Sequence, residues 1–332
     1  MNVDLVIEFG DDYTYINYNN RTYKEASFVA FIKKGRNIKL QAFGESAKKM
    51  LGKSDSSVFI EKPFKAGVID NMELAQIYLN SFIDKVLPHK NFATKIKAVF
   101  VVNCALELEE KRAYEVLAIK CGINQIWFIP SSVAVSVGAG LDISKPDGRL
   151  MVGIGAGTTE IACISQNSIV NGYTIELGGS VIDMALVDTI NDRFGVVVSS
   201  LTAERIKSEI GSLHPTDIAN TEFSGIDALT RSSRTGTVFA KDLYEVFSIA
   251  YDKICDGIGI VISELSADLI NDISRDGIYV YGSGSKVTDL ESFLRKRLDV
   301  PVNILDDETF GVKGASAIFE DKKLLNEIVE KN

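Results

Sequence analysis

Histidine and cysteine are scarce in this chain of 332 residues. It contains 2 histidines and 4 cysteines, at His89, His214, Cys104, Cys121, Cys163 and Cys255. The cysteines are widely separated and none forms a Cys-x-x-Cys pair, which argues against a disulfide framework and against a zinc site. Each stands among apolar residues, so we expect buried thiols. Two isolated histidines, each beside a proline, argue against a histidine-based catalytic triad.

Long apolar runs and a leader sequence are also lacking. No run reaches the roughly 20 apolar residues of a membrane-spanning helix. Val3-Asp-Leu-Val-Ile-Glu8 is typical of a strand, so the sequence indicates neither a signal peptide nor an amphipathic anchor helix. The loop at residues 90–93 offers one aromatic side chain, Phe92, which buries too little area for stable membrane anchoring. We therefore expect a soluble, cytoplasmic protein whose attachment to a membrane is doubtful.

The chain has no excess of positive charge. Its formal net charge is −9 and its pI about 5.0. A protein that binds nucleic acid regardless of sequence needs a basic field to displace counterions, so we expect no nucleic-acid partner. The hydrophobic content of 46% and the charged content of 24% are those of a folded globular protein, and the length favours two domains.

The first half of the sequence opens on strands and continues with alternating helices and strands. Strands are predicted at residues 5–9, 13–18 and 27–32, with Gly10-Asp-Asp12 in the first turn. Three antiparallel strands differ from a Rossmann opening, in which a helix follows the first strand. A polar insert is expected at 33–74. Helix, strand, helix, strand and helix are then predicted at 73–87, 98–102, 107–120, 126–129 and 133–141.

The second half repeats this order. Strands are predicted at residues 150–154, 159–164 and 168–174, with a glycine turn at 155–157. A largely helical insert at 179–245 and a long helical stretch at 243–269 follow. The remaining elements are a strand at 277–281, a helix at 288–296, a strand at 302–304 and helices over 310–330. A duplication of this kind predicts two similar domains whose glycine turns face one cleft.

The repeat gives a domain organisation with four parts. The core of domain I is predicted at residues 1–32 and 75–145, with a small inserted subdomain at 33–74. The core of domain II is predicted at residues 146–178 and 246–332, with a helical inserted subdomain at 179–245.

Glycine turns supply the candidate ligand-binding chemistry. Gly155-Ala-Gly-Thr-Thr159 lies between two strands, where glycines allow the backbone to approach an anion and successive N–H groups can bind it. Gly282-Ser-Gly284 follows a strand and precedes a helix, the position at which a βα turn reaches a ligand. In the helix that begins near Thr202, Glu204 and Lys207 lie three apart on one face. By spacing alone, that pair is an ordinary solvated ion pair.

Several stretches together resemble the bacterial actins of the MreB type and the related magnetosome actin MamK. The similar segments are Lys62-Pro-Phe-Lys-Ala-Gly-Val-Ile69, Val137-Gly-Ala-Gly-Leu141, Ile154-Gly-Ala-Gly-Thr-Thr-Glu-Ile-Ala162, Leu177-Gly-Gly179, Thr202-Ala-Glu-Arg-Ile-Lys-Ser-Glu-Ile-Gly211 and Asp276-Gly-Ile-Tyr-Val-Tyr-Gly-Ser-Gly284. They occur in the order and spacing of that family, from near residue 3 to near residue 320. The resemblance implies an α/β actin-like ATPase fold, in which duplicated ribonuclease-H-like domains form four subdomains around a cleft for ATP or ADP with Mg²⁺.

The resemblance also assigns roles to residues of this chain. It implies that Gly10 and Thr14 belong to a first phosphate loop, that Glu204 and Lys207 contact the ribose of the adenosine, and that Gly178 and Gly179 form a turn beside the phosphates. A second phosphate loop and a loop under the adenine are implied at Gly155, Gly157, Thr158, Thr159, Gly282, Ser283 and Gly284.

The sequence departs from the family pattern where hydrolysis would occur. The aspartate of the family's first loop is replaced by Glu8, and Asp11 and Asp12 stand where the family has small neutral residues. Glu8, Asp11 and Asp12 are therefore the candidate catalytic acids, and Glu8 and Asp11 are the candidate Mg²⁺ ligands. Two added carboxylates would otherwise repel a phosphate.

Two further acids of the family are missing. The position of the metal-side aspartate is Gly153, and the stretch that carries the water-orienting glutamate reads Ile129-Pro-Ser-Ser132. The family's Val-Pro-Ser-Gly turn reads Val102-Asn-Cys-Ala105. Because positioning of water and charge neutralisation supply most of phosphoryl-transfer catalysis, we expect weak or lost ATP hydrolysis.

The leading hypothesis is a bacterial actin-like cytoskeletal protein that binds adenine nucleotide and polymerises, with itself as partner in paired protofilaments. Co-polymerisation with a related bacterial actin is a further option. The alternatives are an actin-like enzyme that hydrolyses ATP with a rearranged metal site, and an actin-fold adaptor that does not polymerise.

Overall fold

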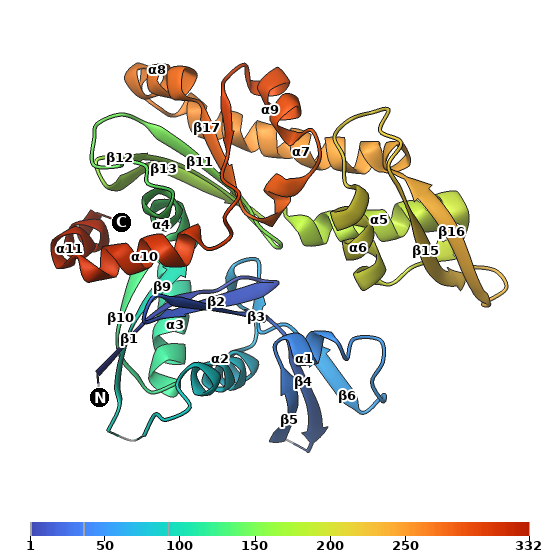
Figure 1. Cartoon of the computed structure of the whole chain (residues 1–332), viewed down its shortest axis with the longest axis horizontal. Coiled ribbons are helices and arrows are strands. Elements are labelled where there is room, and N and C mark those ends of the chain that lie inside the picture. Colours follow the sequence, from blue (N-terminus) through green and yellow to red (C-terminus); the bar gives the residue numbers. More distant parts are fainter. Residues whose placement is uncertain (1, 36, 92, 332) are drawn as a thin grey trace. The chain divides into compact units, whose positions relative to one another are not determined.

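The computed structural model describes residues 2–35, 37–91 and 93–331, so the candidate anchor Phe92 lies outside the described residues. Contacts divide the chain into two compact units (Figure 1). Unit 1 comprises Met1–Pro146, Ile164–Ile169 and Thr309–Asn332, and unit 2 comprises Asp147–Cys163 and Val170–Glu308.

Unit 1 is built on a five-stranded sheet in the order β10-β9-β1-β2-β3. Its strands and helices are β1 (Asn2–Glu8), β2 (Tyr13–Tyr18), β3 (Arg21–Ala26), β4 (Val29–Lys34), β5 (Asn37–Phe43), α1 (Glu45–Lys48), β6 (Val58–Glu61), β7 (Phe64–Lys65), β8 (Val68–Ile69), α2 (Met72–Val86), β9 (Lys95–Val102), α3 (Leu108–Lys120), β10 (Ile123–Pro130), α4 (Ser131–Gly138), α10 (Phe310–Glu320) and α11 (Lys322–Lys331). β1 pairs antiparallel with β2 and parallel with β9, so the opening hairpin sits at the centre of the sheet.

The sheet of unit 1 is buried because alternate residues of its strands point to opposite faces. On β1, Val3, Leu5 and Ile7 are buried in one cluster with residues of α2 and α3. Helix α2 begins where the Asn71 side chain accepts hydrogen bonds from Glu73 N and Leu74 N, both at 3.1 Å. The buried sheet fixes the ends of its strands, and the Gly10 turn follows the end of β1.

The third strand of this sheet differs from the prediction. Residues 21–26 form β3 beside β2, whereas the predicted strand at 27–32 falls mostly on β4 of a separate three-stranded sheet, β5-β4-β6. Phe28 and Ala30 are buried with Ala26 and Ala47 in a small core of the insert. The apolar run therefore belongs to the insert, which begins earlier than residue 33.

The last two helices pack with unit 1, although the sequence assigned residues 309–332 to domain II. Helix α10 lies against α4, and in Figure 1 both red helices, α10 and α11, lie beside the sheet that carries the N-terminus. Close approach requires glycine here, because a Cβ on Gly138 or Gly314 would collide with the backbone of Phe310 or Ala134. The sequence pattern predicted these helices but not that they pack in unit 1.

Unit 2 is built on a second five-stranded sheet, in the order β13-β12-β11-β17-β18. Its elements are β11 (Arg149–Ile154), β12 (Thr159–Ser165), β13 (Ser168–Ile175), α5 (Gly179–Phe194), β14 (Val196–Val197), α6 (Ser200–Ile210), β15 (Asn220–Asp227), β16 (Ser233–Phe239), α7 (Ala240–Ser263), α8 (Ala267–Asp276), β17 (Ile278–Tyr281), a 3₁₀ turn at Ser283–Lys286, α9 (Leu290–Leu298) and β18 (Val302–Ile304). β11 pairs parallel with β17, and β17 with β18, so the order repeats that of unit 1.

The insert at 179–245 is not mainly helical. It holds α5 and α6, but also the three-stranded sheet β14-β15-β16. β15 and β16 pair antiparallel from Asn220↔Phe239 to Ile226↔Ser233. Most of their side chains are exposed, so the strands lack the apolar alternation that would have revealed them.

Helix α7 is the longest helix of unit 2 among the described residues. Its inner face, which includes Leu243, Phe247, Tyr251 and Ile258, is buried in the core of unit 2. Across residues 2–35, 37–91 and 93–331, no helix combines the length and apolar character needed to cross a membrane.

Candidate functional site

The first glycine turn lies in unit 1, between β1 and β2. A Cβ on Gly10 would lie 2.5 Å from the carbonyl oxygen of Tyr13, so the tight turn requires glycine. The Ser27 hydroxyl donates to Gly10 O at 2.6 Å, and Ser27 N donates to Asp12 O at 2.8 Å. The turn is therefore held from the β3–β4 connection.

Asp11 is buried and binds another turn of unit 1. Its carboxylate accepts hydrogen bonds from Ala66 N at 2.7 Å and Gly67 N at 3.0 Å. Ala66 and Gly67 join β7 to β8 and have φ values of 51° and 76°, as in a two-residue hairpin of type I′. Both carboxylate oxygens thus serve the backbone of this hairpin, rather than an open catalytic position.

Asp12 reaches the same region. Its Oδ1 pairs with Lys62 Nζ at 2.5 Å. Tyr114 completes the contact by donating to Gly67 O at 3.2 Å. Burial, and then the charge of Asp11, raises the pKa of Tyr114 above its ordinary value, so this hydroxyl stays a donor. The predicted catalytic acids Asp11 and Asp12 therefore connect the glycine turn to residues 62–67.

The other two predicted residues of this turn have different surroundings. Thr14 is fully buried, and its hydroxyl lies 3.0 Å from Ser27 Oγ, inside unit 1. Glu8 ends β1 and is partly exposed; a Cβ on Gly311 would collide with its carboxylate. Glu8 thus lies against the first turn of α10, where the helix dipole favours a negative charge.

The second glycine turn lies in unit 2, between β11 and β12. Gly155 N donates to Thr158 O at 2.9 Å and closes the turn. Gly179 N donates to Gly155 O at 3.0 Å, and Ser180 N to Ala156 O at 2.8 Å, so the start of α5 is bonded to the turn. A Cβ on Gly178 would lie 2.6 Å from Ala156 O, which explains the glycine there.

Two threonines follow the glycines of this turn. Thr159 is buried and its hydroxyl donates to Leu177 O at 2.6 Å, which ties β12 to the segment before α5. Gly157 and Thr158 are only partly buried. Of the two threonines, Thr158 is the one placed to reach a ligand.

Lys207 lies beside the same turn. From α6, its Nζ donates to Gly179 O at 2.8 Å and pairs with Asp183 Oδ2 at 2.8 Å. Glu204 is one helical turn earlier on α6 and is partly exposed. The sequence pattern did not identify Asp183, which orients the lysine side chain.

The third glycine segment packs on the end of β11. Gly282 has φ 91°, and a Cβ there would lie 2.5 Å from Ile154 O. Tyr251 donates to Gly284 O at 2.6 Å and fixes the loop from α7, while Ser283 is exposed. Unit 2 thus brings together Gly155–Thr158, the start of α5, Lys207 and the Gly282–Gly284 loop.

Tyr281 also lies at this place, and the sequence pattern did not identify it as a site residue. Gly153 on β11 pairs with Tyr281 on β17. A Cβ on Gly153 would lie 2.6 Å from the hydroxyl oxygen and 2.7 Å from Cε2 of Tyr281, so the tyrosine fills the space of the missing side chain. Only the register of the two strands reveals this pairing.

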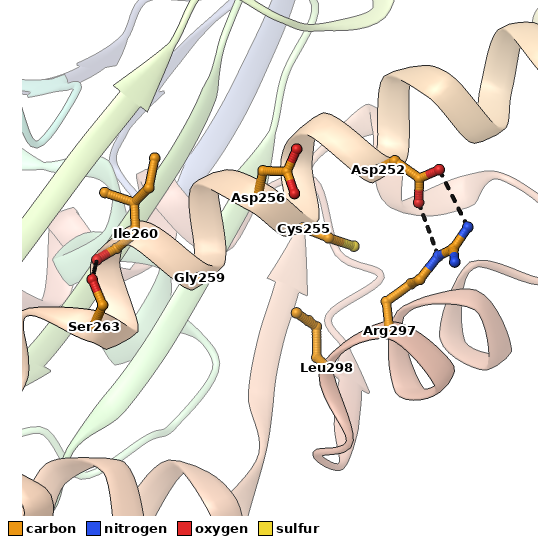
Figure 2. A pocket seen from close by; sticks show the side chains of 8 residues that line it. All are labelled: Asp252, Cys255, Asp256, Gly259, Ile260, Ser263, Arg297 and Leu298. Carbon is orange, nitrogen blue, oxygen red and sulfur yellow. Dashed lines mark hydrogen bonds and ion pairs between the residues drawn. The ribbon is translucent and has the colours of Figure 1, made fainter.

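A groove of about 670 Å³ lies elsewhere in unit 2, between α7 and α9 (Figure 2). Asp252 and Arg297 form an ion pair at 2.9 Å across it. Burial raises the pKa of Cys255 to about 12, so its thiol is not a nucleophile near neutral pH. None of the predicted site residues lines this groove.

Asp11 and Asp12 do not fit the role of carboxylate ligands to a metal ion. Both oxygens of Asp11 accept backbone N–H groups and Asp12 is paired with Lys62. Within the described ranges, no cluster of three or more histidine, cysteine or acidic side chains is arranged to bind a metal. Glu8 and Asp11 were predicted as Mg²⁺ ligands, and this geometry disagrees with that role for Asp11.

Comparison with known proteins gives the same architecture. The profile of the family described as MreB/Mbl protein matches residues 2–327. The cell shape-determining protein MreB of Escherichia coli strain K12 is 28% identical over 309 residues, which are 92% of this chain and 89% of that protein.

Solved structures share the fold over nearly the whole chain. MreB5 of Spiroplasma citri, solved with AMPPNP and with ADP, superposes with TM-scores of 0.91 and 0.90 at 24% identity, covering 99% of this chain and 98% of that one. The MamK double helical filament gives a TM-score of 0.79 at 19% identity, covering 97% and 99%. The predicted actin-like α/β fold is confirmed.

Proposed function

Because this chain belongs to the MreB/Mbl family, we propose that it is a cytoplasmic, cytoskeletal protein that binds adenine nucleotide and polymerises for cell shape or intracellular organisation. The observation that carries the proposal is the convergence, inside unit 2, of the Gly155–Thr158 turn with the start of α5 and the Gly282–Gly284 loop. Glycine turns at the carboxyl ends of β11 and β17 are placed where α/β sheets bind ligands.

ATP or ADP is the proposed ligand. MreB5 of Spiroplasma citri has been solved with AMPPNP and with ADP, which supports the same ligand class here. Gly157 and Thr158 would receive the phosphates through backbone N–H groups and a hydroxyl, on the turn that Gly155 N closes by donating to Thr158 O. Glu204 and Lys207 would contact the ribose, with the Gly282–Gly284 loop under the adenine.

Weak or lost hydrolysis is the second part of the proposal. Gly153 and Ser131-Ser132 stand where the sequence resemblance implies acids, and serine is a poor proton acceptor near neutral pH. The rearranged metal site of the enzyme alternative would use Glu8, Asp11 or Asp12, and two of these three acids have other partners. The carboxylates of Asp11 and Asp12 are bonded to Ala66, Gly67 and Lys62.

Self-association is the third part. Leu108, Val116 and Ile119 are exposed on α3, with Ile119 at 74% of its maximal accessible area. An exposed apolar stripe of this kind suits contact with a second chain, in paired protofilaments or in a co-polymer with a related bacterial actin. The MamK filament supports an assembly of this class.

Electron microscopy of the purified protein, with ATP, with AMPPNP and without nucleotide, tests the proposal together with phosphate release. We expect filaments with either nucleotide and little phosphate release. Ile119→Glu should reduce pairing, whereas Val329→Glu on α11, also at an exposed apolar residue, is the matched control. Phosphate release at the rate of an ordinary bacterial actin would contradict weak hydrolysis, and no filaments in any condition would favour the adaptor.

A further inference from the structure

Neither β11 nor β17, the two strands that end beside the Gly155–Thr158 turn, carries a carboxylate there. β11 offers Gly153 and β17 offers Tyr281 at the paired position. The tyrosine ring lies over the glycine so closely that any larger residue at 153 requires the ring to move. Tyr281 is itself only partly buried, so the aromatic side chain forms part of the surface beside the turn.

Charged side chains of unit 2 also lie near this turn. Lys207 is bonded to Asp183 and to Gly179 O. Glu160 is buried on β12 with 3% exposure. The contacts of the turn itself are made by backbone groups of Gly155, Ala156 and the start of α5. The contacts of the turn are thus made by peptide groups and hydroxyls, and Lys207 beside it is paired with Asp183.

We infer that Tyr281 takes the place of an acidic side chain beside the glycine turn and makes nucleotide binding by this chain largely independent of a divalent cation. The inference rests on the proposed nucleotide binding. A carboxylate next to a phosphate repels it unless a cation lies between them. Where the carboxylate is replaced by a neutral ring, that repulsion is absent and no cation is needed to offset it.

The test is the dissociation constant of ADP, measured by calorimetry in excess Mg²⁺ and in excess EDTA. We expect chelation to weaken binding to the natural chain by less than about threefold. The double variant Gly153→Asp with Tyr281→Ala restores an acid and makes room for it. Chelation should weaken its binding by about tenfold or more, as one added like-charge contact predicts.

Matched variants separate charge from shape. Tyr281→Phe keeps the ring and Tyr281→Ala removes it without adding charge, so both should keep the small cation effect. Tyr279→Ala is the control on the same strand: Tyr279 pairs with Met151 and points to the same face as Tyr281, but the atoms nearest to a Cβ on Gly153 all belong to Tyr281. If the double variant does not fold, Tyr281→Asp places a carboxylate in the same space with Gly153 unchanged.

The outcomes are distinct. A natural chain that loses more than about tenfold in affinity on chelation overturns the inference while leaving the proposed function intact. A double variant that responds to chelation like the natural chain also overturns it. A chain that binds no ADP in either buffer refutes the proposed function and this inference together.

Discussion

The two glycine turns occupy the same place in two sheets of the same order, yet they are held by different chemistry. Gly10 and Gly155 each begin a turn in which the carbonyl oxygen of the residue three further along, Tyr13 or Thr158, lies close to the glycine. In unit 1, carboxylates hold the turn to residues 62–67. In unit 2, peptide groups bond the turn directly to α5. The comparison teaches that the duplicated backbone kept its geometry while the side chains around the turns diverged.

The largest effect is expected from a substitution that disrupts the packing of Gly178 against the Gly155–Ala156 turn of unit 2. Gly178→Ala places a Cβ 2.6 Å from Ala156 O and 2.7 Å from Gly155 O, and neither backbone group can move without opening the turn. We expect a loss of about 3 kcal/mol in the free energy of unfolding, measured in urea. Nucleotide affinity should fall with it, because the turn is displaced.

The control for this change is the same substitution where space is open. A Cβ on Gly259 of α7 has no neighbour within 4 Å. Gly259→Ala should therefore stabilise the protein by about 0.5–1 kcal/mol through the helix preference of alanine. Equal effects of the two substitutions would show that the contact between Gly178 and the turn is unimportant.

The next effect concerns the acid of unit 1. Asp11→Ala deprives Ala66 N and Gly67 N of their acceptor, and each lost bond to a charged group costs about 1–3 kcal/mol when the donor stays out of water. Because this hairpin is partly exposed, we expect about 2 kcal/mol of destabilisation in total. Asp11→Asn should cost less, since its carbonyl oxygen still accepts one bond.

Asp4→Ala serves as the reference for Asp11, since Asp4 is an exposed aspartate of β1. Its effect should stay within about 0.5 kcal/mol. If Asp11→Ala were no more destabilising than Asp4→Ala, Asp11 would not be the connection between the turn and the hairpin.

The smallest effect is expected at Asp12. The side chains of Asp12 and Lys62 are 25% and 31% exposed, so Asp12→Asn should cost less than about 1 kcal/mol. The informative measurement is phosphate release, which should stay as low as in the natural chain. A tenfold change in phosphate release with unchanged stability would instead show that this carboxylate takes part in hydrolysis.

The periodic parts of the fold could be predicted from the sequence, because apolar alternation and glycine punctuation are local signals. The hairpins, the strands at 98–102 and 150–154 and the helix at 73–87 were found in this way. Exposed strands such as β15 carry no alternation of apolar and polar residues in their sequence, and nothing local shows that α10 packs in unit 1. Those features depend on contacts between distant segments.

In the candidate site too, some features follow from local sequence signals and others from contacts between distant segments. Glycines such as Gly155 and Gly282 are visible in the sequence because turns require them. The bonds of Asp11 to Ala66 and Gly67 join residues more than 50 positions apart, and Tyr281 meets Gly153 only through strand register. A sequence shows that a carboxylate is present at a turn, but the folded chain decides whether it is available.

The bonds of Asp12 also bear on how unit 1 tolerates insertions. Its carbonyl oxygen accepts from Ser27 N and its carboxylate pairs with Lys62, so one residue fixes both ends of the segment that carries β4, β5 and β6. With the ends fixed, a flexible surface loop within the segment can be lengthened at little cost, because doubling the length of such a loop adds only about 0.6 kcal/mol of closure entropy. The strand β4 itself must be kept, since Val29 and Phe31 are buried in the core of unit 1.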